Sequence, residues 1–135
     1  MITGGSIDYV EVKREKAGDP KGIGIDIQVQ SVEVSGKNIT LKYNYVVKYE
    51  PDMAHMKMSG TLFAEEDAKK AKEIDDSYKK TKKLPDDFAE TVLNSINFTC
   101  GTNGILVTRP LNLTPPMVPP KIEITKGNKQ QVPAS

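Results

Sequence analysis

Nucleophilic catalysis is the first chemistry to consider, because the chain contains one histidine, His55, and one cysteine, Cys100. A cysteine nucleophile needs an imidazole base within hydrogen-bonding reach, and nothing in the spacing of these two residues brings them together. A solvated histidine on a strand and a buried thiol near the end of a helix are favoured over a catalytic pair. The sequence therefore predicts no catalytic residue and no enzymatic activity.

Metal and cofactor sites lack their usual sequence patterns in this chain. A single histidine and a single cysteine among scattered carboxylates give no spacing of metal ligands. The glycines of GDPKGIG, residues 18–24, do not lie between a strand and a helix, as those of a phosphate-binding loop do. We therefore expect no metal and no cofactor.

A run of lysines between residues 69 and 83 is the one local basic feature: Lys69, Lys70, Lys72, Lys79, Lys80, Lys82 and Lys83. Acidic residues interrupt it, and the whole chain carries 19 basic and 18 acidic residues, a formal net charge of +1. A solvated helix face fits this pattern better than a surface that follows a phosphate backbone. No nucleic-acid partner is expected.

Methionines are more informative candidates for binding. Met53, Met56 and Met58 crowd one strand and the turn before it, and Met117 lies in a proline-rich segment. Such flexible, polarizable side chains suit an irregular core, and they equally suit an apolar surface that accepts many sequences. The sequence alone leaves both interpretations open.

The element that must position these residues is the stretch Asn38–Glu50, NITLKYNYVVKYE. Its odd-numbered positions are apolar or aromatic and its even-numbered positions are mostly polar, which is the period of a strand. A continuous apolar face needs a covering layer. The pattern therefore predicts a strand of an antiparallel sheet that is covered on one side only.

Similar alternation predicts three further strands, over residues 6–15, 23–34 and 54–64. We expect a bulge near Tyr9 in the first, a bulge at Gln30 and Ser31 in the second, and a bend or close approach at Gly60 in the third. Residues 16–24 should form an exposed loop that crosses between strands. These elements predict an α+β fold with a four-stranded antiparallel meander, covered on one face by two helices.

The two helices should follow the strands. Residues 65–83 carry a narrow apolar stripe, so the first helix should be mostly solvated. Pro85 opens the second helix, in which Phe88, Val92 and Ile96 form an apolar ridge. This second helix should be the core helix.

The chain changes character after the second helix. Gly101 should stop the helix and Asn103-Gly104 should form a turn, whereas the structure of the apolar run at residues 105–107 stays open. Prolines 110, 115, 116, 119 and 120 predict an extended segment. We expect one domain, residues 1–126, and a disordered polar tail, residues 127–135.

Composition indicates the oligomeric state and the location of the protein. Only 37% of the residues are hydrophobic and the mean hydropathy is −0.46, which is lean for a monomer that buries a sheet face and two helices. A dimer or tetramer of this chain is therefore expected. One cysteine excludes an intramolecular disulfide framework, and the sequence shows neither an export signal nor an apolar run of about 18 residues. We expect a cytoplasmic protein that does not insert into membranes.

Two motifs behind the strands resemble the SecB-like protein-export chaperone family. FAETVLNSI, residues 88–96, is similar to the main helix of that family, where an aromatic-Ala-x-Glu start precedes an apolar ridge. RPLNLTPPMV, residues 109–118, resembles the family's proline-marked connection after that helix. The resemblance covers about residues 6–120 and includes the order of four strands followed by helices, as in a divergent member of the family.

The resemblance implies a holdase-type chaperone that works without ATP. Its sheets would join edge to edge in dimers, and its main helices would pair the dimers into a homotetramer. Unfolded or extended polypeptides would bind in apolar grooves bordered by residues 16–24 and 109–118. A component of the export machinery would be a further partner.

Candidate site residues follow from this resemblance. The expected peptide-binding residues are Tyr43, Tyr45, Met56, Met58, Leu111, Leu113 and Met117. The expected contact between subunits uses the ridge Phe88, Val92 and Ile96. Two alternatives stay open: a structural or adaptor subunit whose apolar face serves oligomerisation, and a small enzyme or ligand-binding domain with a pocket between sheet and helix.

Overall fold

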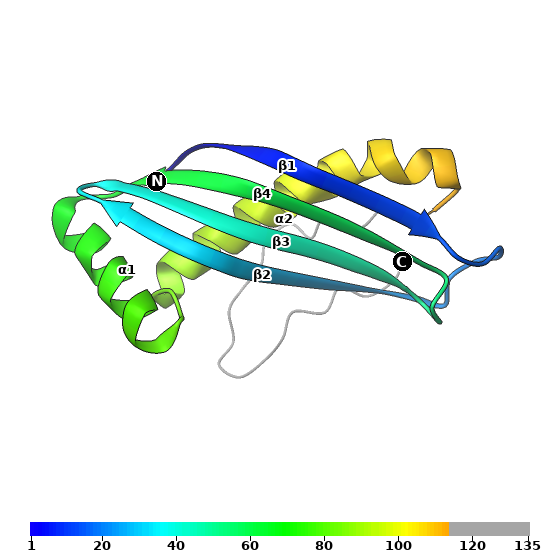
Figure 1. Ribbon diagram of the computed structural model, residues 1–135, viewed down its shortest axis with the longest axis horizontal. Coiled ribbons are helices and arrows are strands. Elements are labelled where there is room, and N and C mark those ends of the chain that lie inside the picture. Colours follow the sequence, from blue (N-terminus) through cyan, green and yellow to red (C-terminus); the bar gives the residue numbers. More distant parts are fainter. Residues whose placement is uncertain (114–135) are drawn as a thin grey trace.

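The computed structural model describes residues 1–113, which fold into an antiparallel sheet and two helices (Figure 1). The elements are β1 (Ile2–Arg14), β2 (Gly22–Ser35), β3 (Asn38–Glu50), β4 (Ala54–Glu65), α1 (Ala68–Thr81), α2 (Asp86–Thr108) and a 3₁₀ turn, η1 (Arg109–Leu111). All strand pairs are antiparallel. The predicted α+β class with a four-stranded antiparallel sheet is confirmed.

The order of strands in the sheet is β1-β4-β3-β2. Strands β2, β3 and β4 form the predicted meander, but β1 pairs with β4 and not with its neighbour in sequence, β2. The loop after β1 therefore crosses from one edge of the sheet to the other. Alternation of side chains identifies strands and their faces but does not say which strands are neighbours, so the position of β1 was not predictable in this way.

The core lies on one face of the central strands. The odd-numbered side chains of β3 are all buried: Ile39, Leu41, Tyr43, Tyr45, Val47 and Tyr49. On β4 the buried apolar side chains are Ala54, Met56, Met58, Leu62 and Ala64, which lie on one face of the strand. Met53, Met56 and Met58 thus belong to an irregular core, which decides between the two interpretations of these methionines.

Both predicted bulges and the predicted close approach are present. The pairing register shifts between Ile7 and Tyr9 in β1 and between Val29 and Ser31 in β2. A Cβ atom at Gly60 would lie 2.4 Å from the carbonyl oxygen of Ser6 and 2.5 Å from the hydroxyl of Tyr43. Only glycine allows β1 and the Tyr43 ring to approach β4 so closely.

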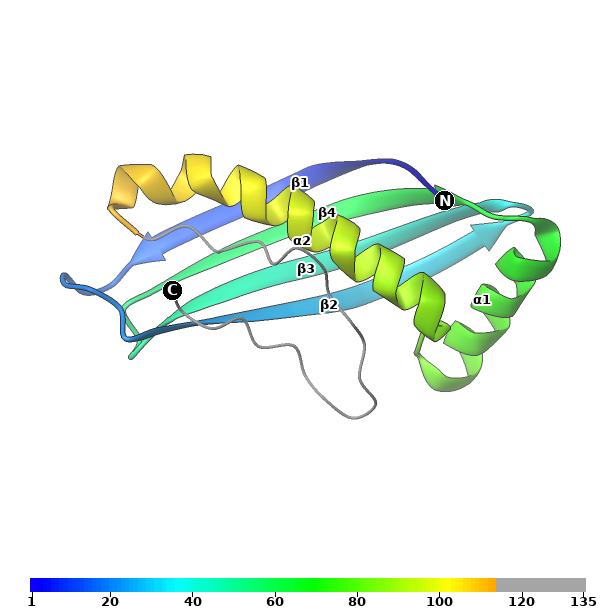
Figure 2. The same ribbon diagram turned by 180° about the vertical axis from the view of Figure 1, so that it is seen from behind.

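Helix α2 crosses the covered face of the sheet diagonally, from the side of α1 to β1 at the other end (Figure 2). Its ridge Phe88, Val92 and Ile96 is buried in the core with β3 and β4. Helix α1 packs at one end of the sheet beside β2 and buries only Ala71 and Ile74. It is mostly solvated, as predicted, and α2 alone spans the face.

The predicted end of α2 at Gly101 and the predicted turn at Asn103-Gly104 are wrong. The helix continues through both glycines to Thr108, whose hydroxyl donates to the carbonyl of Gly104 at 2.7 Å. Glycine in a helix interior costs about 1 kcal/mol relative to alanine. The continued helix buries Cys100, Gly101, Gly104 and Thr108. Packing of this face against the sheet stabilises the helix by more than the two glycines destabilise it.

The segment after α2 also differs from the prediction at its start. Arg109–Leu111 form a turn of 3₁₀ helix and not an extended segment, because a proline is tolerated in the first turn of a helix. Thr114 and the residues after it, including Met117, the expected domain end at residue 126 and the expected tail, lie outside the described residues. No helix within residues 1–113 is both long and apolar enough to span a membrane.

Candidate functional site

The structure brings most of the predicted peptide-binding residues together, but it places them inside the protein. Tyr43, Tyr45, Met56 and Met58 are buried, with 0–3% of their surface exposed. Their predicted role in binding a polypeptide does not fit this conformation, because a polypeptide on the surface cannot touch these four buried side chains. Leu113 is also buried and Leu111 is half-buried, at the end of α2.

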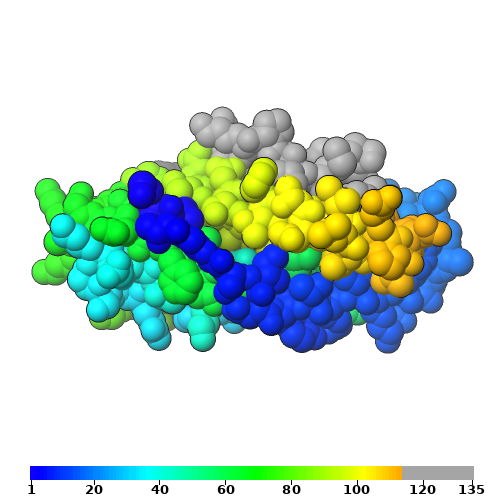
Figure 3. All heavy atoms as spheres, turned by 90° about the horizontal axis from the view of Figure 1, so that it is seen from above, coloured from blue at the N-terminus to red at the C-terminus, as the bar shows by residue number. Residues whose placement is uncertain are grey.

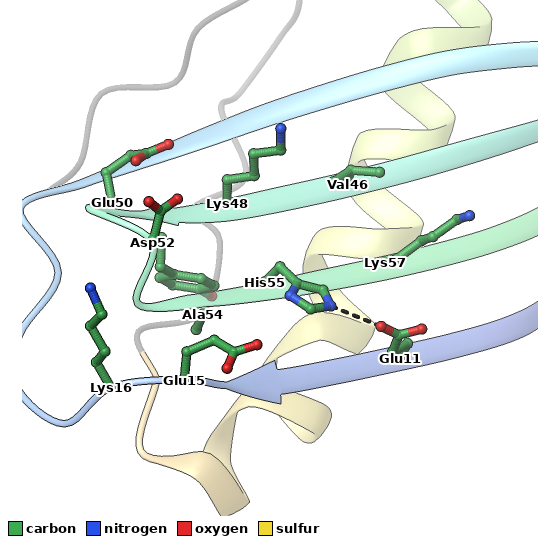
Figure 4. A pocket seen from close by; sticks show the side chains of 11 residues that line it. Glu11, Glu15, Lys16, Val46, Lys48, Glu50, Asp52, Ala54, His55 and Lys57 are labelled. Carbon is green, nitrogen blue, oxygen red and sulfur yellow. Dashed lines mark hydrogen bonds and ion pairs between the residues drawn. The ribbon is translucent and has the colours of Figure 1, made fainter.

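Cys100 lies in this core and not beside His55. Its thiol donates to the Tyr43 hydroxyl at 3.9 Å, and burial raises the pKa of Cys100 to about 11. A thiol with this pKa is protonated at neutral pH and is a poor nucleophile. His55 lies on the opposite, outer face of the sheet (Figure 4), so the two residues do not form a catalytic pair.

The outer face carries an open hollow of about 780 Å³ around His55 (Figure 4). His55 Nε2 lies 2.8 Å from Glu11 Oε1, and the Tyr9 hydroxyl donates to the other oxygen of Glu11. These contacts, Tyr9 first and His55 second, lower the pKa of Glu11. Lysines and carboxylates alternate around the pair, and its described lining holds no serine, threonine or cysteine. The hollow is thus a polar surface with charges of both signs and without a hydroxyl or thiol nucleophile of the serine, threonine or cysteine type.

Metal ligands do not cluster in the part of the chain that the structure describes. Residues 1–113 contain no group of three or more His, Cys, Asp or Glu side chains that could hold an ion.

Among the described residues, a row of apolar side chains on β2 forms an extended surface that is not fully covered. It consists of Ile23, Ile25, Ile27, Val29, Val32 and Val34, which we call the β2 row, and every member is half-buried. These residues lie opposite buried residues of β3 and so face the covered side of the sheet. Strand β2 is an edge strand and α2 runs away from it toward β1, which explains why the row keeps exposed surface (Figure 2).

The backbone of β2 adds to this surface. Among the described strands it pairs with β3 alone, so about half of its N–H and C=O groups point away from the sheet. Proteins often protect such edges with proline or lysine, and the sequence of β2, GIGIDIQVQSVEVS, contains neither. An extended polypeptide could add to this edge and place alternate side chains on the β2 row.

The two loops expected to border a groove meet at the end of β1, at the opposite edge of the sheet from β2. The loop after β1 and the turn η1 are joined by the side chain of Arg14, which donates to carbonyl groups of both. Leu111 and Leu113 follow α2 in the chain and pack with the core. The structure thus places these two predicted residues beside the ends of β1 and α2 and not on β2.

The ridge expected to join subunits is not available for that role in this conformation. Phe88, Val92 and Ile96 are 0–3% exposed and contact the core of their own chain. The exposed apolar side chains of α2 are Phe98, Ile105 and Leu106, at 63%, 44% and 68%. The half of α2 that carries them lies along β1, as the view from above shows (Figure 3). Their helical spacing was visible in the sequence, but the predicted stop at Gly101 separated Phe98 from the other two.

The fold has a counterpart among solved proteins, although no family model matches the chain and no curated protein matches it in sequence. The SecB-like chaperone Rv1957 of Mycobacterium tuberculosis, in complex with a ChAD peptide from the antitoxin HigA1 (Rv1956), superposes with a TM-score of 0.58. The match covers 93% of this chain and 87% of that chain, at 13% sequence identity. This chain therefore has the fold of a SecB-like chaperone.

Proposed function

We propose that this protein, which has the fold of SecB-like chaperones, is an ATP-independent holdase that binds unfolded or extended polypeptides. One observation carries the proposal: a half-exposed row of β-branched residues lies on an edge strand that pairs with one strand only among the described residues. Of its outer side, the carbonyl of Gln30 in the bulge accepts from the Tyr78 hydroxyl of α1 at 3.3 Å. A folded protein would rarely leave such an edge open, because it invites pairing with another chain. The similar chaperone Rv1957 was solved with a bound peptide, which supports a polypeptide ligand.

The contact is proposed for the β2 row, and not for the buried tyrosines and methionines. An extended polypeptide presents apolar side chains at every second position, the same period as the β2 row. Six β-branched side chains provide contact without a fixed pocket for any one residue, which suits many sequences. Clients of varied sequence are therefore expected, including polypeptides on the way to export.

We also propose that the protein self-associates. The exposed face of α2, formed by Phe98, Ile105 and Leu106, gives one apolar contact, and the edge of β1 gives another. A dimer or a tetramer would bury both surfaces and would supply the apolar contact that a chain with 37% hydrophobic residues needs. The single buried cysteine suits the reducing cytoplasm, where we place the protein.

A matched pair of substitutions on β2 tests the site. Ile27 faces the core side and Gln28 faces the outer side of the same strand. Complete burial of an isoleucine side chain contributes roughly 1.5–3 kcal/mol, so Ile27→Ser should weaken binding about fivefold, whereas Gln28→Ser should leave it unchanged. Fluorescence anisotropy of labelled, reduced and carboxymethylated α-lactalbumin measures both, with circular dichroism as the check that each variant is folded.

The alternative is an adaptor subunit of the same fold whose apolar surfaces serve oligomerisation alone. Its support is the exposed face of α2, which needs no client to explain it. The two functions differ in the same titration. If the parent protein shows no binding of the unfolded polypeptide, the adaptor function is favoured and the chaperone proposal is abandoned.

A further inference from the structure

The edge strand β2 consists of two runs that a bulge separates. Residues 22–29, which we call the first run, pair with β3 one for one, and residues 31–35, the second run, do so again after the register shift. Gln30 is the extra residue between the two runs. A bulge bends its strand and increases the local twist. A regular extended polypeptide that pairs with the first run therefore loses its register at Gln30.

Helix α1 lies beside the second run. The Tyr78 hydroxyl of α1 donates to the carbonyl of Gln30 at 3.3 Å, so this carbonyl already has a partner within the chain. Ile74 of the same helix belongs to the core, against which Val32 and Val34 of the second run also pack. Figure 1 shows α1 next to the end of β2, whereas the start of the strand lies at the other end of the sheet. The helix and the bulge thus meet at one place on the edge.

Burial and polar contacts fix α1 in this place. Ile74 is 0% exposed. Near the start of the helix, Lys70 forms an ion pair with Asp87 of α2, and just after its end Lys82 Nζ lies 5.2 Å from the centre of the Tyr78 ring. The burial is the larger contribution, because water weakens ion pairs at the surface. A client that paired with the second run would have to displace this helix.

The first run presents a regular edge with four apolar side chains on the covered side of the sheet. These are Ile23, Ile25, Ile27 and Val29, and each is half-buried. The eight residues of the run span roughly 26 Å of extended chain. A polypeptide that adds to such an edge pairs its backbone with the strand and lays every second side chain on the row.

We infer that the client-binding edge ends at Val29, so that each chain takes one extended segment of about eight residues, an inference that rests on the proposed function. The bulge at Gln30 and the helix that covers it form the stop. This narrows the client contact from the whole β2 row to the four side chains of the first run. The preferred client segment then carries apolar side chains at four successive alternate positions, and further alternation beyond them adds no contact.

Two exposed carboxylates on the outer face of β2 can report how far a client reaches. Asp26 lies in the first run, opposite Val46, and Glu33 lies in the second run, opposite Thr40. The intervening side chains of a client paired with β2 would lie on this outer face, beside these residues. Opposite charges on neighbouring strands attract and like charges repel. Only Asp26 should sense the charge of a client that ends at Val29.

Charge reversal at these two positions tests the stop. The probe is a fluorescein-labelled peptide of alternating valine and glutamate with 14 residues, the length of β2 itself. Asp26→Lys should bind this probe about fivefold more tightly than the parent, because a repulsion becomes an attraction. Glu33→Lys should bind it within about twofold of the parent in about 0.15 M salt, which screens charges more than about 8 Å apart. Fluorescence anisotropy measures both affinities, and circular dichroism checks that each variant is folded.

The two variants are matched, because each replaces one exposed carboxylate of β2 by lysine and changes the net charge equally. A second probe with lysine in place of glutamate should show the opposite sign, weaker binding to Asp26→Lys and unchanged binding to Glu33→Lys. The inference is overturned if both variants respond equally, since the client would then pair along the whole of β2. It is also overturned if the parent binds the probes and Asp26→Lys binds them no differently.

A measurement on the parent protein covers the case in which a variant does not fold. Binding of the 14-residue probe should slow hydrogen exchange of amides in residues 23–29 and leave the exchange of α1 unchanged. Faster exchange in α1 would mean that the client displaces the helix, and it would overturn the inference, as would bound probe without protection of residues 23–29. A parent protein that binds neither probe instead contradicts the proposed function, so the two failures can be told apart.

Discussion

Three tyrosines of β3 place polar hydroxyl groups in the core of this protein. Tyr43 receives a hydrogen bond from the thiol of Cys100, whereas the hydroxyl oxygen of Tyr45 is buried with no partner among the described residues. A buried hydroxyl without a hydrogen bond costs about 1–3 kcal/mol. Tyr45→Phe should therefore leave the free energy of unfolding unchanged or raise it.

These groups also predict a loss of stability at alkaline pH. Burial raises the pKa of Tyr43 and Tyr45 above the ordinary value, that of Tyr49 to about 12 and that of Cys100 to about 11. The folded chain holds these protons more tightly than the unfolded chain. Stability should therefore be constant up to about pH 9 and fall as the pH rises toward 12, by about 1.4 kcal/mol per pH unit for each group that ionises only on unfolding.

Urea unfolding at about pH 8, 10 and 11 measures this dependence, with Tyr45→Phe as the comparison. The variant lacks one of the buried protons, so its stability should fall less steeply above about pH 10 than that of the parent. Equal slopes would mean that Tyr45 ionises alike in the folded and unfolded chains and would contradict its placement in the core.

At the scale of residues, the sequence predicted on which face of the sheet a side chain lies, but not whether that side chain is buried. Alternation correctly placed Tyr43, Tyr45, Met56 and Met58 on one side of the sheet. Whether that side is a groove floor or a core depends on the path of α2, which the alternation of a strand does not contain. The four residues were therefore predicted as binding residues and found in the interior.

At the scale of elements, Gly60 joins three strands through its missing side chain. Gly60→Ala would put a Cβ atom against the carbonyl of Ser6 on β1 and the hydroxyl of Tyr43 on β3. A backbone carbonyl cannot move without shifting β1, and forced overpacking costs about 1–3 kcal/mol. The expected result is a lower midpoint of thermal unfolding, measured by circular dichroism.

Gly24→Ala on β2 is the control for this substitution. A Cβ atom at Gly24 would meet no atom within 4 Å, so the change should be neutral or slightly stabilising. Equal stability of the Gly60→Ala protein and the parent would show that β1 does not lie against β4 in the described register.

The elements themselves were predicted better than their connections. The strands, both bulges, the solvated α1 and the ridge of α2 all follow from periodicity in this sequence. The continuation of α2 through Gly101 and Gly104 did not, because packing on the sheet exceeds the local cost of two glycines. The exposed row on β2 was also missed as a site, since it depends on β1 occupying the far edge of the sheet.

At the scale of the whole molecule, the exposed face of α2 predicts self-association. Leu106 is 68% exposed in the single chain, and Leu106→Asp would place an unpaired carboxylate in a contact between subunits. The cost of burying such a charge should shift the assembly toward smaller species. Sedimentation velocity at micromolar concentration measures the shift between parent and variant.

Gln28→Asp adds the same charge on the outer face of β2 and should leave the assembly unchanged. A parent protein that sediments as a 14.9 kDa monomer would contradict the prediction and remove the role of the α2 face. If the oligomer persists in the Leu106→Asp protein, the contact between subunits lies at the edge of β1 instead.

Suppression of aggregation tests the central claim most directly, that this protein holds unfolded polypeptides on the β2 row. Light scattering of reduced insulin should fall when the parent protein is added without ATP, and the Gln28→Ser protein should act as well as the parent. The Ile27→Ser protein should need an about fivefold higher concentration for the same suppression of scattering, because it has lost an apolar contact with the client. Undiminished scattering in the presence of the folded parent protein would contradict the account.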